Sequence, residues 1–230
     1  MRRKTLLSWS SGKDSAWTLE VLLRDPAVEV VGLFSALNGR VDRVSMHATR
    51  SELLRLQAQA AALPLYTISL PEPCTNEEYE FRVGKAVAGF AAEGIVCMAF
   101  GDLFLEDIRQ YRERNLAGTG IEPLFPLWKR PTRELALEML DAGMETYISS
   151  VDLKKLPLSF AGRRWTRELL EELPSGVDPC GENGEFHTIV SGGPMFKERI
   201  EIAVGEIVQR DGFGYADIIP QLGQNPSPGA

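Results

Sequence analysis

The sequence has few of the residues from which metal centres and disulfide networks are built. Its 230 residues include three cysteines and two histidines. The cysteines, Cys74, Cys97 and Cys180, are far apart and form no C-x-x-C pair. An odd, widely spaced set disfavours a disulfide framework and a cysteine-rich zinc or iron–sulfur site. Two histidines are too few for a metal site built mainly from histidine.

Long apolar runs and an excess of positive charge are also missing. No stretch approaches the roughly 20 apolar residues of a membrane span, and the apolar run after the basic N-terminus is too short for a signal peptide. The formal net charge is −7, so the surface on balance repels nucleic-acid phosphates. We therefore expect a cytoplasmic protein with neither a membrane nor a nucleic acid as its partner.

The first half of the chain alternates between strand and helix patterns. Short apolar runs predict strands at 4–9, 28–37, 65–70 and 95–100, and helical spacing of apolar residues predicts helices at 13–24, 49–63, 76–93 and 107–117. Such a β–α repeat predicts an α/β fold with a Rossmann-like parallel sheet and helices on both faces.

The second half has a different pattern. Pro123, Pro126 and Pro131 mark the change, and beyond them we expect helices at 132–142 and 164–173 and strands at 145–151, 186–191, 200–209 and 215–219. This order predicts a smaller α+β domain. We divide the chain into a first domain at 1–122, a second at 123–220, and a flexible tail at 221–230.

The segment Ser10–Ser15 joins the first predicted strand to the first predicted helix. Unpaired N–H groups at a helix start carry partial positive charge and bind phosphate. We expect Gly12 to supply the positive φ of a phosphate nest, Lys13 to add charge, and Asp14 to bind Mg²⁺ beside the phosphates. The alternative is a serine-capped helix start with a solvated Lys–Asp pair. A Walker loop is excluded because Leu7 and Asp14 stand where it needs glycine and Ser or Thr.

Residues Ser10–Ser15 resemble the S-G-G-K-D-S loop of the N-type ATP pyrophosphatases, PP-loop enzymes that cleave ATP between its α and β phosphates. The resemblance implies a HUP-type sheet in the first domain, with ATP and Mg²⁺ as cofactors. Ser11 stands where that family has its first glycine, so a positive φ there would be strained. Loops after parallel strands converge at one sheet edge. The expected nucleotide site is Ser8, Ser10, Ser11, Gly12, Lys13, Asp14, Ser15, Phe34, His47, Gly101 and Asp102, with Asp14 as the metal ligand.

A second and more specific motif, Asp178–Thr188, closely resembles the C-G-E-[GN]-G-E-[FY]-H-T signature of the diphthine–ammonia ligase family. Further matches at Gln57-Ala58 and Pro126-Leu127-Trp128 extend the resemblance over about 6–202. It implies that the second domain binds the substrate. The expected substrate-binding residues are Cys180, Gly181, Glu182, Asn183, Gly184, Glu185, His187 and Thr188, and the expected catalytic residues are Lys13, Asp14, Glu182, Glu185 and His187.

Several roles stay open. Glu182 or Glu185 is a candidate base for ammonium or a holder of its charge, and His187 is either a donor to a developing charge or a hydrogen-bonded structural residue. Cys180 is either a nucleophile or a small buried residue. His47 either approaches the nucleotide or caps the following helix.

The resemblance implies an ATP-dependent ligase that adenylates a substrate carboxylate, releases pyrophosphate and transfers ammonia or an amine. The implied acceptor is diphthine on elongation factor 2. In an organism without that modification, such as a bacterium, the acceptor is unknown. Two alternatives remain, a tRNA-thiolating enzyme and a nucleotide-binding regulatory module without turnover. A homo-oligomer is left open.

Overall fold

The computed structural model describes residues 1–38, 43–44 and 49–221, and it contains one sheet of six strands and one of four. The first sheet and its helices comprise β1 (Arg3–Ser8), α1 (Lys13–Arg24), β2 (Val28–Asn38), β3 (Arg43–Val44), α2 (Ser51–Ala60), β4 (Leu65–Leu70), α3 (Asn76–Ala92), β5 (Cys97–Ala99), α4 (Glu106–Leu116) and β6 (Glu122–Leu124). The rest comprises α5 (Thr132–Asp141), β7 (Glu145–Asp152), the 3₁₀ turn η1 (Leu158–Phe160), α6 (Arg167–Glu172), β8 (Phe186–Gly192), β9 (Ile202–Arg210) and β10 (Phe213–Pro220).

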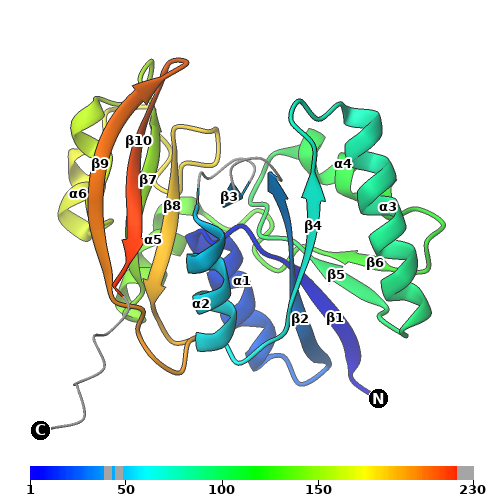
Figure 1. Cartoon of the computed structure of the whole chain (residues 1–230). Helices are drawn as coiled ribbons and strands as arrows, with labels where there is room; N and C mark the ends of the chain where they lie inside the picture. The colour runs from blue at the N-terminus through cyan, green and yellow to red at the C-terminus, as the bar shows by residue number, and fades with distance from the viewer. Residues whose placement is uncertain (39–42, 45–48, 222–230) are drawn as a thin grey trace, which may run out of the picture.

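Five strands of the first sheet run parallel in the order β4-β2-β1-β5-β6 (Figure 1). The short β3 pairs antiparallel with the end of β2. Helices connect most of the parallel strands, as parallel pairing requires. The predicted α/β class with a Rossmann-like sheet is therefore confirmed.

Helices cover both faces of this sheet because its strands are apolar on both sides. In β1, the adjacent residues Leu6 and Leu7 are fully buried but belong to different clusters, since successive side chains of a strand point to opposite faces. Leu7 packs with residues of α1 and α2. Leu6 packs with Val87 and Phe90 of α3 and with residues of α4.

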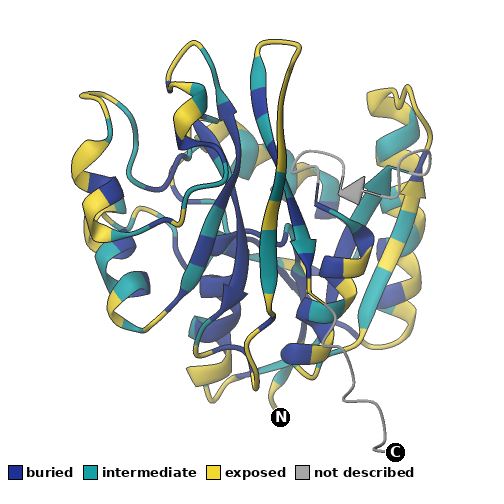
Figure 2. Ribbon diagram, turned by 60° about the vertical axis from the view of Figure 1, so that its left-hand side comes forward, coloured by how far each residue is buried: buried dark blue, intermediate teal, exposed yellow. Residues whose placement is uncertain are grey.

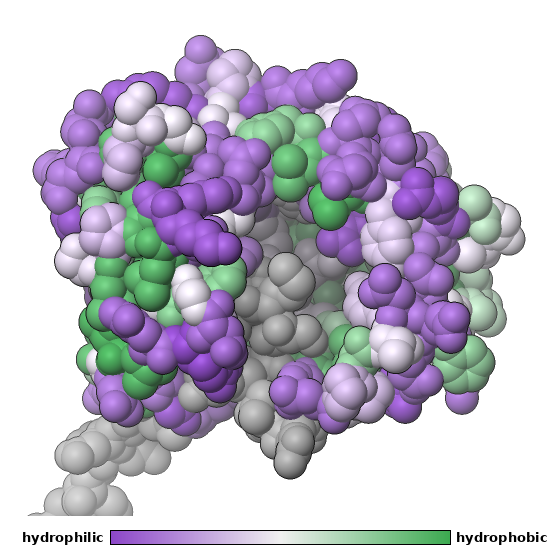
Figure 3. All heavy atoms as spheres, turned by 90° about the horizontal axis from the view of Figure 1, so that it is seen from above, coloured by the Kyte–Doolittle hydropathy of each residue, from purple (hydrophilic) through white to green (hydrophobic). Residues whose placement is uncertain are grey.

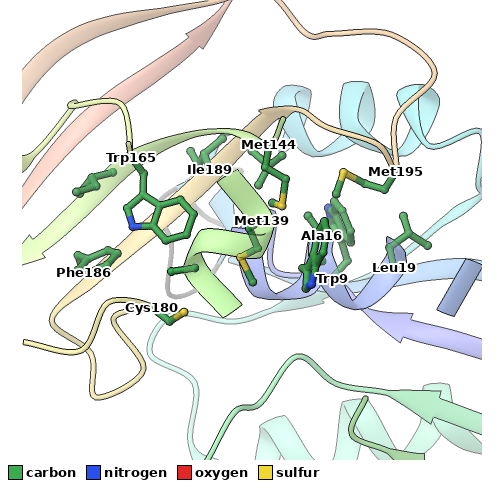
Figure 4. Close-up of a cluster of buried hydrophobic side chains, with 14 of the residues drawn as sticks. Trp9, Ala16, Leu19, Met139, Met144, Trp165, Cys180, Phe186, Ile189 and Met195 are labelled. Carbon is green, nitrogen blue, oxygen red and sulfur yellow. The ribbon is translucent and has the colours of Figure 1, made fainter. Parts of the chain in front are cut away.

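The second sheet is antiparallel, in the order β8-β7-β10-β9. Its core is continuous with that of the first sheet, because one cluster contains Trp9 and Leu19 from the first part and Met139, Ile189 and other residues from the second (Figure 4). The centre of the molecule is accordingly buried, whereas β9 at the outer edge is largely exposed (Figure 2). In the part of the chain that the structure describes, no helix is both long enough and apolar enough to cross a membrane.

Several elements differ from the sequence-based prediction, among them the helix expected at 49–63, which spans only Ser51–Ala60. The helix expected at 164–173 is shorter, because Arg164 instead bridges to Tyr147 beside β7. The two-residue strand β3, the turn η1 and the edge strand β6 were not predicted. Pro123 lies inside β6 and is tolerated there because an edge strand leaves one row of N–H groups unpaired. The proposed domain boundary at 122/123 thus falls within a strand of the first sheet, and the division into two domains stays a prediction.

Candidate active site

A cavity of about 260 Å³ lies where the loops after β1 and β5 meet the segment before β8. Seen from above, most of the molecule's surface is hydrophilic, and apolar side chains gather toward the left of the view (Figure 3). The lining residues are Ser8, Ser10, Gly12, Lys13, Asp14, Ser15, Phe100, Gly101, Asp102, Leu105, Ile108, Arg112, Cys180, Gly181, Glu182, Gly184, Phe186, His187 and Thr188. Two motifs about 170 residues apart in the sequence therefore line one cavity.

The backbone of the phosphate loop, residues 10–15, differs from the expectation in one respect. Positive φ occurs at Ser11, with a value of 71°, whereas Gly12 is extended with φ −87°. The prediction that Gly12 supplies the positive φ is therefore wrong. The left-handed conformation occurs at Ser11, which stands in place of the family's first glycine. A positive φ at this serine is strained, as stated for the sequence above.

Ser11 is held in this conformation from three directions. Its Oγ lies 2.8 Å from Thr49 Oγ1, and its carbonyl accepts hydrogen bonds from Val190 N at 3.1 Å and from Gln57 Nε2 at 3.0 Å. Ser11 and Gln57 are both fully buried. Such surroundings over-determine a backbone conformation that is unfavourable by itself.

Other backbone atoms approach two glycines closely, so that a side chain would be tightly accommodated at Gly12 and would force a shift at Gly101. A Cβ on Gly12 would lie 3.1 Å from the carbonyl oxygen of Thr188, and one on Gly101 would lie 2.9 Å from the carbonyl carbon of Asp14. Gly12 lies where the loop passes close to β8, and Gly101 lies where the end of β5 passes close to the start of α1. Both glycines let the three segments meet.

The edge strand β8 binds the phosphate loop directly. Thr188 Oγ1 accepts a hydrogen bond from Lys13 N at 3.1 Å, and Val190 N donates to Ser11 O. Gln57 of α2 completes the junction, because its Nε2 donates to Val190 O at 2.7 Å while its Oε1 accepts from Trp9 Nε1 at 2.9 Å. The free edge of the second sheet is thereby joined to the loop of the first.

Lys13 is buried, with 2% of its side chain exposed. Its Nζ donates to both carboxylate oxygens of Asp14, at 3.0 and 2.8 Å, and to the carbonyl oxygen of Cys180. The rings of Trp165 and Phe186 lie 5.8 and 5.7 Å from it. Burial opposes the charge on Lys13, but Asp14 and neighbouring acidic groups outweigh it, so the pKa of Lys13 is raised and the ammonium stays protonated.

Glu182 links the signature segment to the loop after β5. Its Oε1 accepts a hydrogen bond from Leu103 N at 2.7 Å and a longer one from Phe104 N at 3.4 Å. Burial raises the pKa of the Glu182 carboxyl to about 7, and the negative charge of Asp14 adds to the shift. Near neutral pH both the protonated and the ionised form of this carboxyl are therefore populated.

The signature segment is braced from within by two other carboxylates. Asp178 Oδ2 accepts from the backbone N–H groups of Cys180 and Glu182, at 3.1 and 3.0 Å. Glu185 Oε1 accepts from Asp178 N and Asn183 Nδ2, at 3.2 and 3.1 Å. Asp178 was quoted in the motif but not selected as a site residue. An aspartate often accepts a hydrogen bond from the backbone N–H two residues later, as in an Asx turn. That tendency was the available signal for Asp178.

His187 and Cys180 are both largely removed from water. Burial, with a smaller effect of Lys13, lowers the pKa of His187 to about 4, so its imidazole is neutral at physiological pH. Burial raises the pKa of the Cys180 thiol, and its Sγ contacts the carbonyl oxygen of Thr132 at 3.4 Å. A protonated, buried thiol favours the packing role of Cys180 over the nucleophilic one.

The predicted site residues fall into four groups. Most line the cavity, as given above. Ser11, Asn183 and Glu185 support the lining without forming part of it, and Phe34 instead lines a neighbouring slot of about 30 Å³. His47 lies outside the described residues. Arg112 of α4, which was not among the expected site residues, also lines the cavity.

Comparison with known proteins extends these observations. Residues 131–221 match a family model described as diphthamide synthase C-terminal domain. The chain is 27% identical to a diphthine–ammonia ligase of Bos taurus and 26% identical to that of Homo sapiens, in each case over 91% of this chain and 86% of the relative. The corresponding enzyme of Danio rerio is 27% identical over 91% of this chain and 90% of its own length.

Proposed function

Because this chain is a relative of the diphthine–ammonia ligases, we propose that it is an ATP-dependent ligase that forms a carbon–nitrogen bond. A substrate carboxylate attacks the α-phosphate of ATP and pyrophosphate leaves. Ammonia or an amine then attacks the acyl carbon and AMP leaves. The observation that carries this proposal is the cavity itself, in which the phosphate loop, Gly101-Asp102 and the signature segment meet.

The phosphate loop is the proposed site of the departing pyrophosphate. The first turn of α1 begins at Lys13 and borders the cavity, so its unpaired N–H groups favour an anion there. The hydroxyls of Ser10 and Ser15 line the same wall. The slot that contains Phe34 is apolar enough for the adenine ring, but its small volume requires side chains to move before the ring enters.

The residues present also fit Mg²⁺. The carboxylate of Asp14 lines the cavity and is partly exposed, and an ionised carboxylate has acceptor sites left after binding Lys13. Among the described residues no group of three or more His, Cys, Asp or Glu side chains is arranged for a metal. This agrees with Mg²⁺, which is usually held by one or two carboxylates together with substrate phosphates. When bound, Mg²⁺ would neutralise charge on those phosphates.

The signature segment is the proposed site of the second step. A general base works best when its pKa lies near the working pH, and Glu182, with a pKa of about 7, meets that condition for taking a proton from ammonium. Neutral His187 is able to donate a hydrogen bond to charge that develops on the acyl oxygen. For the acceptor we propose diphthine on elongation factor 2, or another carboxylate where that residue is not made.

The products of ATP cleavage test the reaction. The protein is incubated with Mg²⁺, ammonium, ATP labelled at the α-phosphate, and a cell extract that contains proteins and metabolites. We expect labelled AMP together with pyrophosphate. Labelled AMP should not form with Lys13→Ala, which removes the buried ammonium. It should still form with Lys85→Ala, which removes an exposed ammonium. Labelled ADP in place of AMP would exclude cleavage at the α-phosphate.

The two alternatives receive less support. A thiolating enzyme is expected to use paired cysteines, but all three cysteines are free, and Cys97 and Cys180 are buried. A regulatory module without turnover is consistent with the strained Ser11. Bound ATP that persists unchanged in the labelled assay, with every candidate acceptor present, would favour that module.

A further inference from the structure

The two side-chain cations in the cavity wall differ in what they have left to offer a ligand. An ammonium has three N–H donors. Those of Lys13 are all used within the protein, by the two carboxylate oxygens of Asp14 and by Cys180 O. Lys13 therefore contributes charge to the cavity but makes a direct contact with a ligand only after one of these bonds breaks.

Arg112 of α4 has donors to spare and is already oriented. Its Nε faces Asp102 Oδ2 at 3.5 Å, and its guanidinium lies over the ring of Phe100, 5.1 Å from the centroid. Its side chain is 28% exposed. Among the described residues, neither of its Nη groups makes a hydrogen bond. A planar fork fixed by an ion pair and a ring is well suited to bind an oxyanion through two N–H groups.

The location of Arg112 indicates which oxyanion. Ser8, Phe100 and Arg112 line both the cavity and the apolar slot beside it. Arg112 therefore stands between the phosphate loop at one end of this region and the slot at the other. In a nucleotide whose two outer phosphates lie on the loop, the phosphate nearest to the slot is the inner one.

We propose that Arg112 binds the α-phosphate of ATP and stabilises the charge that develops there when the acceptor attacks. This rests on the proposed function, which it deepens by naming the residue at the reacting phosphorus. The carboxylates of Asp14, Asp102 and Glu182 also line the cavity, so a phosphate without a facing cation would be repelled. Arg112 offsets that repulsion at the border between the cavity and the slot.

Affinities for three ligands test the assignment. The full chain is titrated with AMP, pyrophosphate and a non-hydrolysable α,β-methylene ATP, each with Mg²⁺. In Arg112→Gln we expect AMP and the ATP analogue to bind about 10- to 100-fold more weakly, as for loss of a charge-assisted hydrogen bond, with pyrophosphate affinity unchanged. Arg112→Lys keeps the charge but not the planar fork, so its affinities for AMP and the ATP analogue should lie between those of the wild type and Arg112→Gln. The control is Arg114→Gln, which removes the same charge from an exposed position on the same helix.

A stereochemical readout separates a direct contact from a structural role. The two diastereomers of ATP carrying sulfur at the α-phosphate present that phosphate differently to a fixed fork. Wild-type protein and Arg114→Gln should prefer one diastereomer in AMP formation, and Arg112→Gln should lose much of that preference. Thermal unfolding of each variant checks that the comparison is made on folded protein.

Three results would overturn the assignment. Unchanged affinities in Arg112→Gln would mean that Arg112 touches no phosphate. Weaker binding of pyrophosphate but not of AMP would place Arg112 on the leaving group. In both cases AMP formation by the wild type would leave the proposed function standing. Failure of the wild type to bind any of the three ligands would instead contradict the proposed function and the assignment together.

Discussion

Ser11 combines a left-handed backbone with a residue that rarely adopts it. Its φ of 71° is compensated by the hydrogen bond of its Oγ to Thr49 and by the two donors on its carbonyl. A residue with a Cβ loses roughly 1–2 kcal/mol in this conformation. The hydrogen bond of the hydroxyl therefore offsets part of the conformational free energy that a glycine at this position would not lose.

Paired substitutions at Ser11 separate the two effects. Ser11→Ala and Ser11→Gly both lose the bond to Thr49, but only alanine keeps a strained Cβ. We expect the glycine variant to be more stable than the alanine variant by roughly 0.5–1 kcal/mol, after the larger unfolded-state entropy of glycine is subtracted. Free energies of unfolding from urea titrations measure the difference. An alanine variant as stable as the glycine variant would show that Ser11 is not strained.

Glu182 should make stability depend on pH in a definite direction. Its carboxyl has a folded pKa of about 7 against 4.5 for the free group. Between these values the folded protein keeps a proton that the unfolded chain releases, so this contribution is complete below about pH 4.5 and is lost as the pH rises through about 7. Ionisation destabilises the wild type by up to about 3 kcal/mol.

The neutral variant Glu182→Gln measures this contribution, since its Oε1 still accepts from Leu103 N. We expect its stability relative to the wild type to increase as the pH rises from about 5 to about 8. His187, whose lowered pKa acts in the opposite sense over part of this range, is common to both proteins and cancels. Melting temperatures at several pH values provide the measurement. A difference that does not vary with pH would show that Glu182 titrates normally.

At the scale of elements, the edge of β8 forms hydrogen bonds with another backbone segment. Exposed strand edges usually carry features that prevent such pairing with other chains. Here the partner is internal. Val190 N and Val190 O bind Ser11 and Gln57, and Thr188 Oγ1 binds Lys13 N. The strand that carries the end of the signature is thus fixed against the loop proposed to bind phosphate.

The side chain of Gln57 makes three buried hydrogen bonds at this junction. Gln57→Leu preserves the size of the side chain but leaves Val190 O and Trp9 Nε1 buried without their partner. We expect a loss of about 3 kcal/mol in the free energy of unfolding. Gln59→Leu, on the exposed face of the same helix, should change it by less than about 0.5 kcal/mol. Similar losses in the two variants would contradict a specific role for Gln57.

At the scale of the whole molecule, the two sheets share one core. Leu7 and Trp9 from the first part pack in the same buried cluster as Ile148 and Val190 from the second. Neither sheet can lose its packing without exposing apolar surface of the other, which costs free energy in proportion to that area. The cavity lies at this junction, so its geometry depends on both sheets being folded.

We therefore expect the chain to unfold in a single transition. Far-UV circular dichroism and tryptophan fluorescence should follow one curve with denaturant, and the calorimetric and van't Hoff enthalpies should agree. Tryptophans occur in both parts, at Trp9 and Trp17 and at Trp128 and Trp165, so fluorescence reports on each. Two separated transitions would show that the parts fold independently, despite their shared core.

The sequence by itself determined the order and type of most elements. Helical or alternating apolar spacing is a local property, and it located α1 and β4 with their observed bounds. It failed where local pattern is short or overridden: β6 has three residues and contains Pro123, and Arg164 is drawn out of the predicted helix by Tyr147. The two site motifs could also be identified from the sequence, because each is a continuous run of residues.

Only the tertiary structure decided how those two motifs act on each other. Lys13 meets Thr188 across 175 positions of sequence and Cys180 across 167. Such contacts leave no periodic trace, since they depend on how two sheets pack. The same packing put the positive φ on Ser11 rather than Gly12, occupied all three donors of Lys13, and left the fork of Arg112 facing the cavity. Sequence named the chemical groups, and long-range packing decided which of them has a donor or acceptor available for a ligand.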